Sequence, residues 1–267
     1  MEYDIEDSNV MKRILLFLIT ALLSSATVFS INEIDSKGRK QGVWKKPYGN
    51  GYFMYEGEFK DDLPVGTFKR YYEDGVLKSI QQYGQNETSA IVIYENDGLT
   101  KAAQGAYIGK EKEGEWIYYV GGKVSLIEHY QKGVLVDTMK SFAKTGELIE
   151  TTPYKNGKVN GVKTCYLQDG KLYSESPYKM GVEDGMYKLY EGHDFPVIEG
   201  LYVQGKRHGN WLVKDDAGNV KDTLKYDMGV LLNNKELNRE YAAEAAENEK
   251  NEGKIPEPDQ MINAAGK

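Results

Sequence analysis

Carboxylates are the most numerous side chains in this 267-residue sequence that could do acid–base chemistry, since Asp and Glu together number 41. Most of them stand where the chain is expected to turn, as at Asp61-Asp62, Asp74, Asp97, Asp169 and Asp215-Asp216. Asp is favoured in turns because it tolerates a left-handed backbone and its side chain accepts hydrogen bonds from nearby N–H groups. We therefore expect these carboxylates to stabilise turns, and we predict no catalytic residue and no enzyme activity.

The histidines and the single cysteine do not form a pattern for metal binding or nucleophilic catalysis. His129, His193 and His208 are scattered and lack the spacing of metal ligands. One cysteine, Cys165, excludes an intrachain disulfide, and no histidine stands at a fixed spacing to activate its thiol. We expect His129 to point away from Tyr130 toward water, His208 to lie in a turn, and Cys165 to be buried in a strand. No metal or cofactor is predicted.

Patterns for binding phosphate or membranes are sparse. The segment Gly105-Ala-Tyr-Ile-Gly109 does not lie between a strand and a helix, as a phosphate-binding loop would. The net charge of −7 argues against a nucleic-acid partner. Basic residues occur as pairs beside acids, at Lys45-Lys46, Lys69-Arg70 and Lys206-Arg207. Contact with a membrane surface through these pairs is kept as an alternative.

Aromatic side chains are the remaining candidates for binding, because exposed Trp and Tyr stack on sugar rings or surround a choline group. The segment Glu115-Trp-Ile-Tyr-Tyr119 is similar to choline- and glucan-binding repeats of cell walls. Those repeats place tryptophans in adjacent units, whereas Trp44, Trp116 and Trp211 stand far apart. We therefore predict that the tryptophans pack in a core, and we keep glycan contact as an alternative.

A repeat of about 24 residues positions these side chains. Its first marker is Gly-x-aromatic, which begins at Gly42 and recurs through Gly209, and it defines eight repeats between residues 42 and 230. Ser89 and Asp137 replace the leading glycine, and Lys163 replaces the aromatic residue, so these repeats are expected to be irregular. The other markers are the late tyrosines Tyr83, Tyr107, Tyr130, Tyr154, Tyr178, Tyr202 and Tyr226 and the mid-repeat glycines Gly75, Gly98, Gly122, Gly146, Gly170 and Gly218.

Each repeat reads as two short strands. In the fourth repeat Trp116, Tyr118 and Val120 alternate with other residues, and a second alternating run follows Gly121-Gly122. Two glycines between alternating runs indicate a hairpin, because the tight turn needs positive φ. No sustained helical period occurs over residues 31–230. The predicted fold is all-β: an elongated, single-layer array of about eight antiparallel β-hairpin repeats.

The two ends of the chain read differently from the repeats. Lys12-Arg13, an apolar run over 14–23 and small residues up to Ser30 predict a signal peptide over residues 1–30, with translation starting at Met11. We expect an exported protein, periplasmic or extracellular, with an uncleaved anchor as the alternative. Residues 31–41 form a lead-in. Residues 231–267 form an acidic tail that is either disordered or folded as a short helix that caps the last strand.

Several segments resemble the MORN (membrane occupation and recognition nexus) repeat. These are Tyr55-Glu-Gly-Glu-Phe59 followed by Gly66-Thr-Phe68, and residues 202–211. Residues 154–161 and 169–172 are more similar to its bacterial variant, found in YwqK-type proteins that are often labelled antitoxins. The resemblance covers about residues 42–229. It implies a binding or spacing module built from β-hairpins.

Together these observations predict a non-catalytic, exported repeat protein that acts as a binding or scaffold module in the cell envelope. The expected partner is another envelope protein. Two alternatives stay open: an antitoxin or immunity protein, and a peripheral lipid- or glycan-binding protein.

Overall fold

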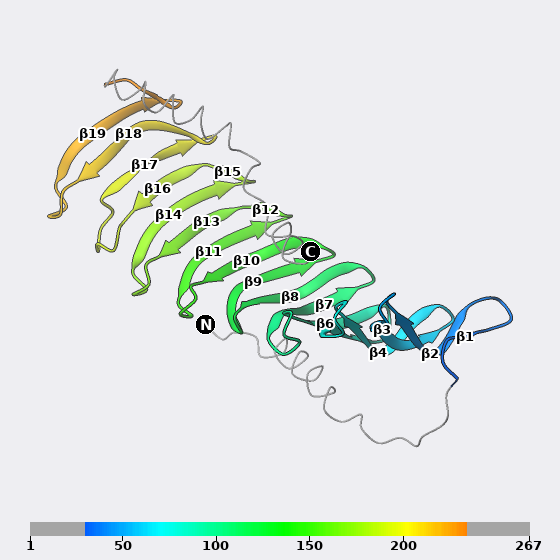
Figure 1. Ribbon diagram of the computed structural model, residues 1–267. Coiled ribbons are helices and arrows are strands. Elements are labelled where there is room, and N and C mark those ends of the chain that lie inside the picture. The colour runs from blue at the N-terminus through cyan, green and yellow to red at the C-terminus, as the bar shows by residue number, and fades with distance from the viewer. Residues whose placement is uncertain (1–29, 234–267) are drawn as a thin grey trace, which may run out of the picture. The chain divides into compact units, whose positions relative to one another are not determined.

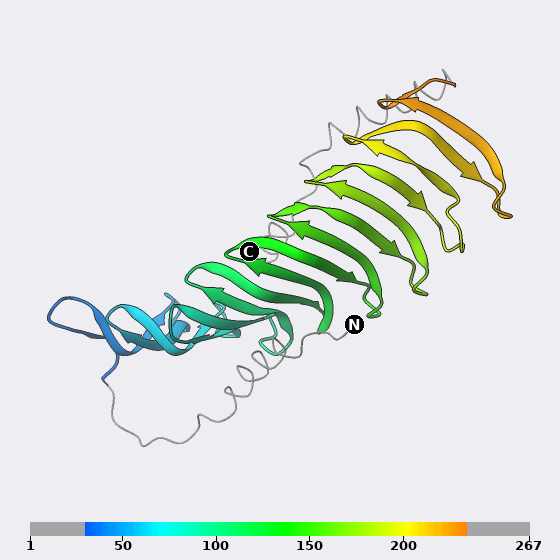
Figure 2. The ribbon, with the colours of Figure 1, turned by 180° about the vertical axis from the view of Figure 1, so that it is seen from behind.

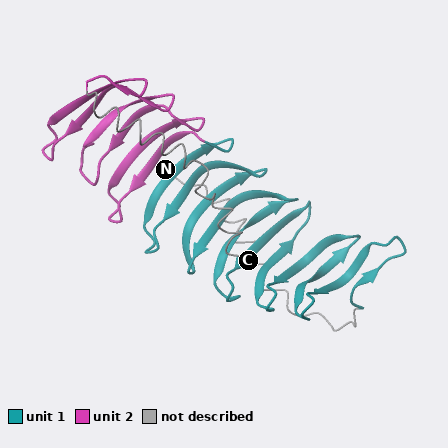
Figure 3. Cartoon of the chain, turned by 45° about the horizontal axis from the view of Figure 1, so that its top comes forward, with its two compact units in different colours: residues 1–158 teal, residues 159–267 magenta. Residues whose placement is uncertain are grey.

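The computed structural model describes residues 30–233. The predicted signal peptide therefore lies almost wholly outside the described residues, as does most of the predicted tail over residues 231–267. The chain divides into two compact units, residues 1–158 and 159–267 (Figure 3). No helix occurs within residues 30–233, so none there could cross a membrane. The prediction of an all-β array of antiparallel hairpins is confirmed.

In the N-terminal unit each strand pairs with the next along the chain, always antiparallel (Figure 1). The pairs β2–β3, β4–β5, β6–β7, β8–β9 and β10–β11 are the first five repeats. The strands are β1 (Glu33–Ile34), β2 (Lys40–Pro47), β3 (Phe53–Lys60), β4 (Leu63–Tyr71), β5 (Leu77–Tyr83), β6 (Thr88–Tyr94), β7 (Lys101–Ile108), β8 (Glu111–Val120), β9 (Lys123–Gln131), β10 (Val134–Phe142) and β11 (Leu148–Lys155).

The C-terminal unit continues the same pattern with antiparallel pairs in chain order (Figure 2). The pairs β13–β14, β16–β17 and β18–β19 are repeats six to eight, and the short strand β12 spans the boundary between the units. The strands are β12 (Lys158–Val159), β13 (Gly161–Tyr166), β14 (Leu172–Lys179), β15 (Val182–Glu183), β16 (Gly185–Leu189), β17 (Ile198–Val203), β18 (Lys206–Lys214), β19 (Val220–Asp227) and β20 (Val230–Leu231).

Two-residue turns with positive φ close several of the connections. Gly121 and Gly122, between β8 and β9, have φ of 57° and 75°. The turn between β9 and β10 is similar, with Lys132 at 50° and Gly133 at 73°. Both central residues of a type I′ turn need positive φ, and the twist of this turn matches that of the two strands. The glycine-rich turns therefore set the register of the hairpins.

The leading glycine of repeats two, four and eight lies in a β-bulge. Between β7 and β8, Ala106 pairs with Glu113 and Gln104 pairs with Ile117, so residues 114–116 lie opposite Gly105 alone. Gly114 takes a φ of 67° there. The extra residues bend the strand and fold the Trp116 side chain back over the neighbouring hairpin. The same shift in register occurs at Gly66 in β4 and at Gly209 in β18.

Two segments outside the predicted repeats also join the sheets. In the lead-in, β1 pairs with β2, and Trp44 Nε1 donates a hydrogen bond to the carbonyl of Glu33 at 3.2 Å. At the other end, β20 pairs with β19, and Leu231 is only 1% exposed. It packs with Trp211 and Tyr226 in the core of the C-terminal unit. Leu231 was expected in the tail, but it completes the last repeat.

Candidate functional site

The tryptophans of repeats four and eight lie in cores. Trp116 and Trp211 are each 2% exposed, and their Nε1 atoms donate to the carbonyls of Ala106 and Leu201 at 3.0 Å and 3.2 Å. Trp44 in the first repeat is half-buried. Rings that are buried in this way cannot stack on a sugar, so the geometry favours packing for Trp116 and Trp211.

The marker tyrosines pack edge-on against these rings. Tyr107 meets Trp116 with ring centroids 5.0 Å apart, and Tyr202 meets Trp211 at the same distance, both in T-shaped contact. Tyr226 is 3% exposed. The other marker tyrosines are half-buried, namely Tyr83, Tyr107, Tyr130, Tyr154, Tyr178 and Tyr202. The mid-repeat glycines lie in turns with positive φ, at Gly75, Gly98, Gly122, Gly146, Gly170 and Gly218.

The sequence reasoning missed a second glycine, which lies under the large ring in repeats two, four and eight. A Cβ atom added to Gly57, Gly105 or Gly200 would overlap the ring of Phe68, Trp116 or Trp211, respectively. Each of these glycines precedes its aromatic residue by the same number of positions, which is a signal visible in the sequence. The bulge brings ring and glycine together across two neighbouring hairpins.

A cation covers each tryptophan ring. Lys112 Nζ lies 4.8 Å from the ring centroids of both Trp116 and Tyr130, and it donates to the Tyr118 hydroxyl at 2.7 Å. In the same position of their repeats, Lys40 covers Trp44 at 4.9 Å and Arg207 covers Trp211 at 4.6 Å. Each basic residue stands four positions before its tryptophan. The chain's own cations thus occupy the site that a choline group would need.

The aromatic row is interrupted at the third repeat, and also by Met139 in the fifth and Lys163 in the sixth. In the third repeat Ile91 stands in place of an aromatic residue, and the strands β5 and β6 pair without a bulge, with Gln81 opposite Ile91. The cause is visible in the numbering, since Gln81 and Ser89 are eight positions apart whereas Gly105 and Gly114 are nine apart. One residue fewer removes the bulge.

The interruption leaves an open groove of about 440 Å³ within the N-terminal unit, which we call the repeat-three groove. Side chains opposite each other in antiparallel strands share a face, so Ser79, Gln81, Tyr83, Ile91 and Ile93 line one face of β5 and β6. This volume is in the range of small-ligand sites. The full lining is Arg70, Lys78, Ser79, Gln81, Tyr83, Ile91, Ile93, Tyr107, Gly109 and Lys110.

Polar groups in the groove form a connected network. Arg70 Nη1 donates to Gln81 Oε1 at 2.9 Å, and Tyr83 donates to the same oxygen at 3.1 Å. Gln81 Nε2 in turn donates to Ser89 Oγ at 3.0 Å. Gln81 and Ser89 are only 8% and 6% exposed. The Arg70 guanidinium is therefore anchored by side chains that are themselves buried.

The groove is positively charged. Its lining includes Arg70, Lys78 and Lys110 and contains no carboxylate. No carboxylate among residues 30–233 lies at ion-pair distance from Arg70. Burial raises the pKa of the Tyr107 hydroxyl, and the positive charge of Arg70, which also lines the groove, opposes that rise. Glu87 lies beside Gly109 at the Lys110 end.

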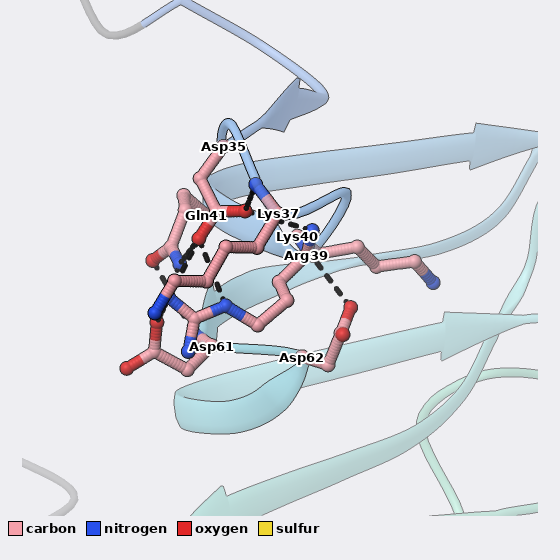
Figure 4. Close-up of polar contacts among 7 residues, drawn as sticks. All are labelled: Asp35, Lys37, Arg39, Lys40, Gln41, Asp61 and Asp62. Atoms are coloured by element: carbon pink, nitrogen blue, oxygen red, sulfur yellow. Dashed lines mark hydrogen bonds and ion pairs between the residues drawn. The ribbon is translucent and has the colours of Figure 1, made fainter.

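A cluster of polar contacts among seven residues lies at the start of the N-terminal unit (Figure 4). Arg39 Nη2 contacts Asp35 Oδ2 and Asp61 Oδ1, each at 2.7 Å, and Gln41 donates to Asp61 Oδ1 at 2.8 Å. The Lys40 N–H donates to Asp62 Oδ1 at 2.8 Å. These contacts tie the β1–β2 turn to the β3–β4 turn.

Asp35 is the centre of this cluster. Hydrogen bonds from the Arg39 backbone, the Arg39 side chain, the Lys37 backbone and Gln41 lower its pKa to about 2. Asp61 and Asp62 have φ of 55° and 67°, which fits their expected place in a turn. The carboxylates of this cluster are bound by the chain's own donors, which indicates a structural role.

The remaining residues considered for chemistry lie apart. His208 is in β18 rather than in a turn, with Nδ1 3.5 Å from Asp227 Oδ1, because the turn ends before Lys206. His129 was expected to face water, but its side chain is half-buried and its Nε2 lies 3.6 Å from Glu115 Oε2. Cys165 is in β13, as expected, but it is only half-buried. Residues 30–233 contain no cluster placed to bind a metal.

The fold and these contacts define an array of β-hairpin repeats that are joined by ring packing. Two segments, residues 64–84 and 159–180, match the family model described as the MORN repeat variant. They cover the second repeat and most of the sixth. No curated protein matches the chain. The similarity to MORN repeats is therefore supported, and repeats of this kind generally mediate binding rather than catalysis.

Proposed function

We propose that this protein is a non-catalytic binding module that is exported to the cell envelope, where it binds another protein through the repeat-three groove. The observation that carries the proposal is the interrupted aromatic row. Where this row carries a tryptophan, a cation of the same repeat covers the ring, namely Lys40, Lys112 or Arg207. At Ile91 the row leaves an open, charged groove instead.

The carboxylates support a binding role over a catalytic one. In the described residues the turn aspartates accept hydrogen bonds from backbone N–H groups, as Asp74 does from Val76 at 3.0 Å and Asp215 does from Asn219 at 2.9 Å. A carboxylate that acts as a general acid or base would instead need to be within hydrogen-bond reach of a bound substrate. Export is proposed from residues 1–30, because their pattern is that of a signal peptide.

A photo-reactive amino acid at position 91, introduced into the full chain in its native cell, tests the proposal. Its matched control is position 92, since neighbouring residues of a strand face opposite sides. We expect a discrete crosslinked product in the envelope fraction from position 91 and none from position 92. Equal crosslinking at both positions, none at either, or recovery of the chain only in the cytoplasm would contradict the proposal.

The antitoxin role is a separate proposal that rests on similarity to the YwqK-type variant of the repeat. It predicts a toxic gene product that kills the cell when this protein is removed. Deleting the gene alone, and then together with its neighbours, distinguishes the two roles. A lethal single deletion that is rescued by removing a neighbour would favour the antitoxin role.

A further inference from the structure

We infer that the repeat-three groove binds the C-terminal carboxylate of a polypeptide whose last residue is apolar. This inference rests on the proposed function and names the chemistry of the partner. Its basis is the juxtaposition, within one groove, of an unpaired guanidinium at Arg70 and an apolar floor at Ile91 and Ile93.

The charge of the groove selects an anion. Arg70 is held in place by Gln81 through a neutral hydrogen bond at 2.9 Å, which leaves its positive charge without an acidic partner. A guanidinium has five N–H donors in a planar fork, so after this bond it can still bind a carboxylate through two of them. The arginine is also pre-organised, because it lies over the ring of Phe68 at 5.7 Å.

The number of cations favours a single negative charge. Lys78 lies over the ring of Tyr72 at 5.0 Å, and Lys110 stands at the end of the groove where Glu87 also lies. Of the three cations in the lining, Arg70 is the one fixed by a hydrogen bond to the buried Gln81, so it is placed to bind a ligand deep in the groove. A phosphate that carries two charges, or an anionic lipid surface, is better matched by clustered basic residues.

The apolar floor favours a C-terminal carboxylate over the carboxylate of an Asp or Glu side chain. Ile91 and Ile93 lie on the same face as Gln81 and Ser79, directly opposite them in the sheet. A ligand bound at Arg70 would therefore rest on aliphatic side chains, with Tyr83 and Tyr107 beside it. A C-terminal apolar residue places its side chain next to its carboxylate. The carboxylate of an Asp or Glu side chain carries no such group.

Three matched peptides test the inference with the full-length protein. The probe is N-acetyl-alanyl-alanyl-phenylalanine with a free carboxylate, and its C-terminal amide removes the charge and nothing else. The third peptide ends in glutamine amide and carries its only carboxylate on an internal glutamate side chain. Inorganic phosphate is a fourth ligand. Binding is measured by calorimetry and by NMR shifts of the Ile91 and Ile93 methyl groups.

We expect the free acid to bind at least about tenfold more tightly than the amide and the glutamate peptide, because a hydrogen bond to a charged group contributes about 1.5–3 kcal/mol. The variant Arg70→Gln should weaken binding of the acid by a similar factor and leave the amide unchanged. Arg70→Lys, which keeps the charge but loses the fork, should be intermediate.

Lys69→Gln is the matched control, because it removes the same charge from the same strand. Lys69 faces the other side of the sheet, where its Nζ lies 3.6 Å from Glu56, and this variant should bind the acid as the parent does. Circular dichroism would establish that every variant is folded. Three results would each overturn the inference. These are equal affinity for the acid and the amide, equal loss of affinity for the acid in Lys69→Gln and Arg70→Gln, and tighter binding of phosphate or of the glutamate peptide than of the acid.

The peptide result and the crosslinking result are independent. If position 91 crosslinks to an envelope protein but the free acid does not bind, the inference about the carboxylate fails and the proposed function stands. If the acid binds but no crosslink forms in cells, the proposed function fails and the chemistry of the groove stands.

Discussion

Gly105 lies directly beneath the indole ring of Trp116, so closely that a Cβ atom at this position would overlap the ring. The two residues belong to neighbouring hairpins and are brought together by the bulge at Gly114. The same contact joins Gly57 to Phe68 and Gly200 to Trp211. Ring-on-glycine packing is thus the repeated contact between hairpins.

Gly105→Ala should destabilise the N-terminal unit by about 1–3 kcal/mol, because the added methyl group overpacks the site. Gly49→Ala is the control: its Cβ meets no atom within 4 Å and its φ is not positive, so the change should stay within about 0.5 kcal/mol. Chemical denaturation measures both. Adding Trp116→Ile to Gly105→Ala should remove most of the penalty for the new methyl group, since Ile91 already tolerates a side chain opposite it. Equal effects of the two glycine substitutions would contradict the packing described here.

The Lys112 ammonium group should stabilise the Trp116 cluster. Lys112→Met keeps an unbranched apolar chain but removes the charge, and it should cost about 0.5–2 kcal/mol through loss of the cation–π contacts and of the hydrogen bond to the Tyr118 hydroxyl. Lys123→Met is the control, because Lys123 is exposed at the start of β9. The measurement is the free energy of unfolding. If both variants have the parent's stability, the cation over the rings contributes nothing.

Leu231 should be part of the core of the last repeat. It is 1% exposed, so Leu231→Ala should destabilise the C-terminal unit by about 2–5 kcal/mol. Its neighbour Leu232 is 55% exposed, and Leu232→Ala should change stability by less than about 0.5 kcal/mol. Thermal and chemical unfolding compare the two. A mild effect at Leu231 would show that the repeat array ends before β20.

Asp35 should make stability depend on pH. Its pKa is lowered to about 2 in the folded protein, against about 3.9 for an unperturbed Asp. A lowered pKa means that its contribution to stability is present above about pH 4 and is lost as the pH falls toward 2. Asp35→Asn should therefore be less stable than the parent at pH 6, and the difference should shrink near pH 2. A difference that stays constant with pH would contradict this role.

The fold was predictable because its markers are local. The alternation around Trp116 and the turn at Gly121-Gly122 set strands and hairpins within one repeat, and these appear in the structure as β8 and β9. The contacts between hairpins were not predictable, because they depend on register. Gly105 and Trp116 are both visible in the sequence, but only the bulge shows that they touch.

The candidate site was not predicted, for a related reason. The groove exists because the third repeat has Ile91 where most other repeats have an aromatic residue, and because it has no bulge at Ser89. The sequence showed both departures, but an irregular repeat does not by itself indicate a groove. In the sequence, Arg70 is only the second residue of the basic pair Lys69-Arg70. The face of the sheet on which its side chain lies is shown by its hydrogen bond to Gln81.

The most direct test replaces residues 81–91 with the sequence of residues 105–116. This graft restores the missing residue, the bulge glycine and a tryptophan in the third repeat, so it should fill the repeat-three groove with a buried ring. We predict a folded protein at least as stable as the parent, with blue-shifted tryptophan emission from the added indole and no binding of the peptide acid. A graft that does not fold, or one that binds the acid as the parent does, would contradict the conclusion that the groove is an interruption in a row of equivalent hairpins.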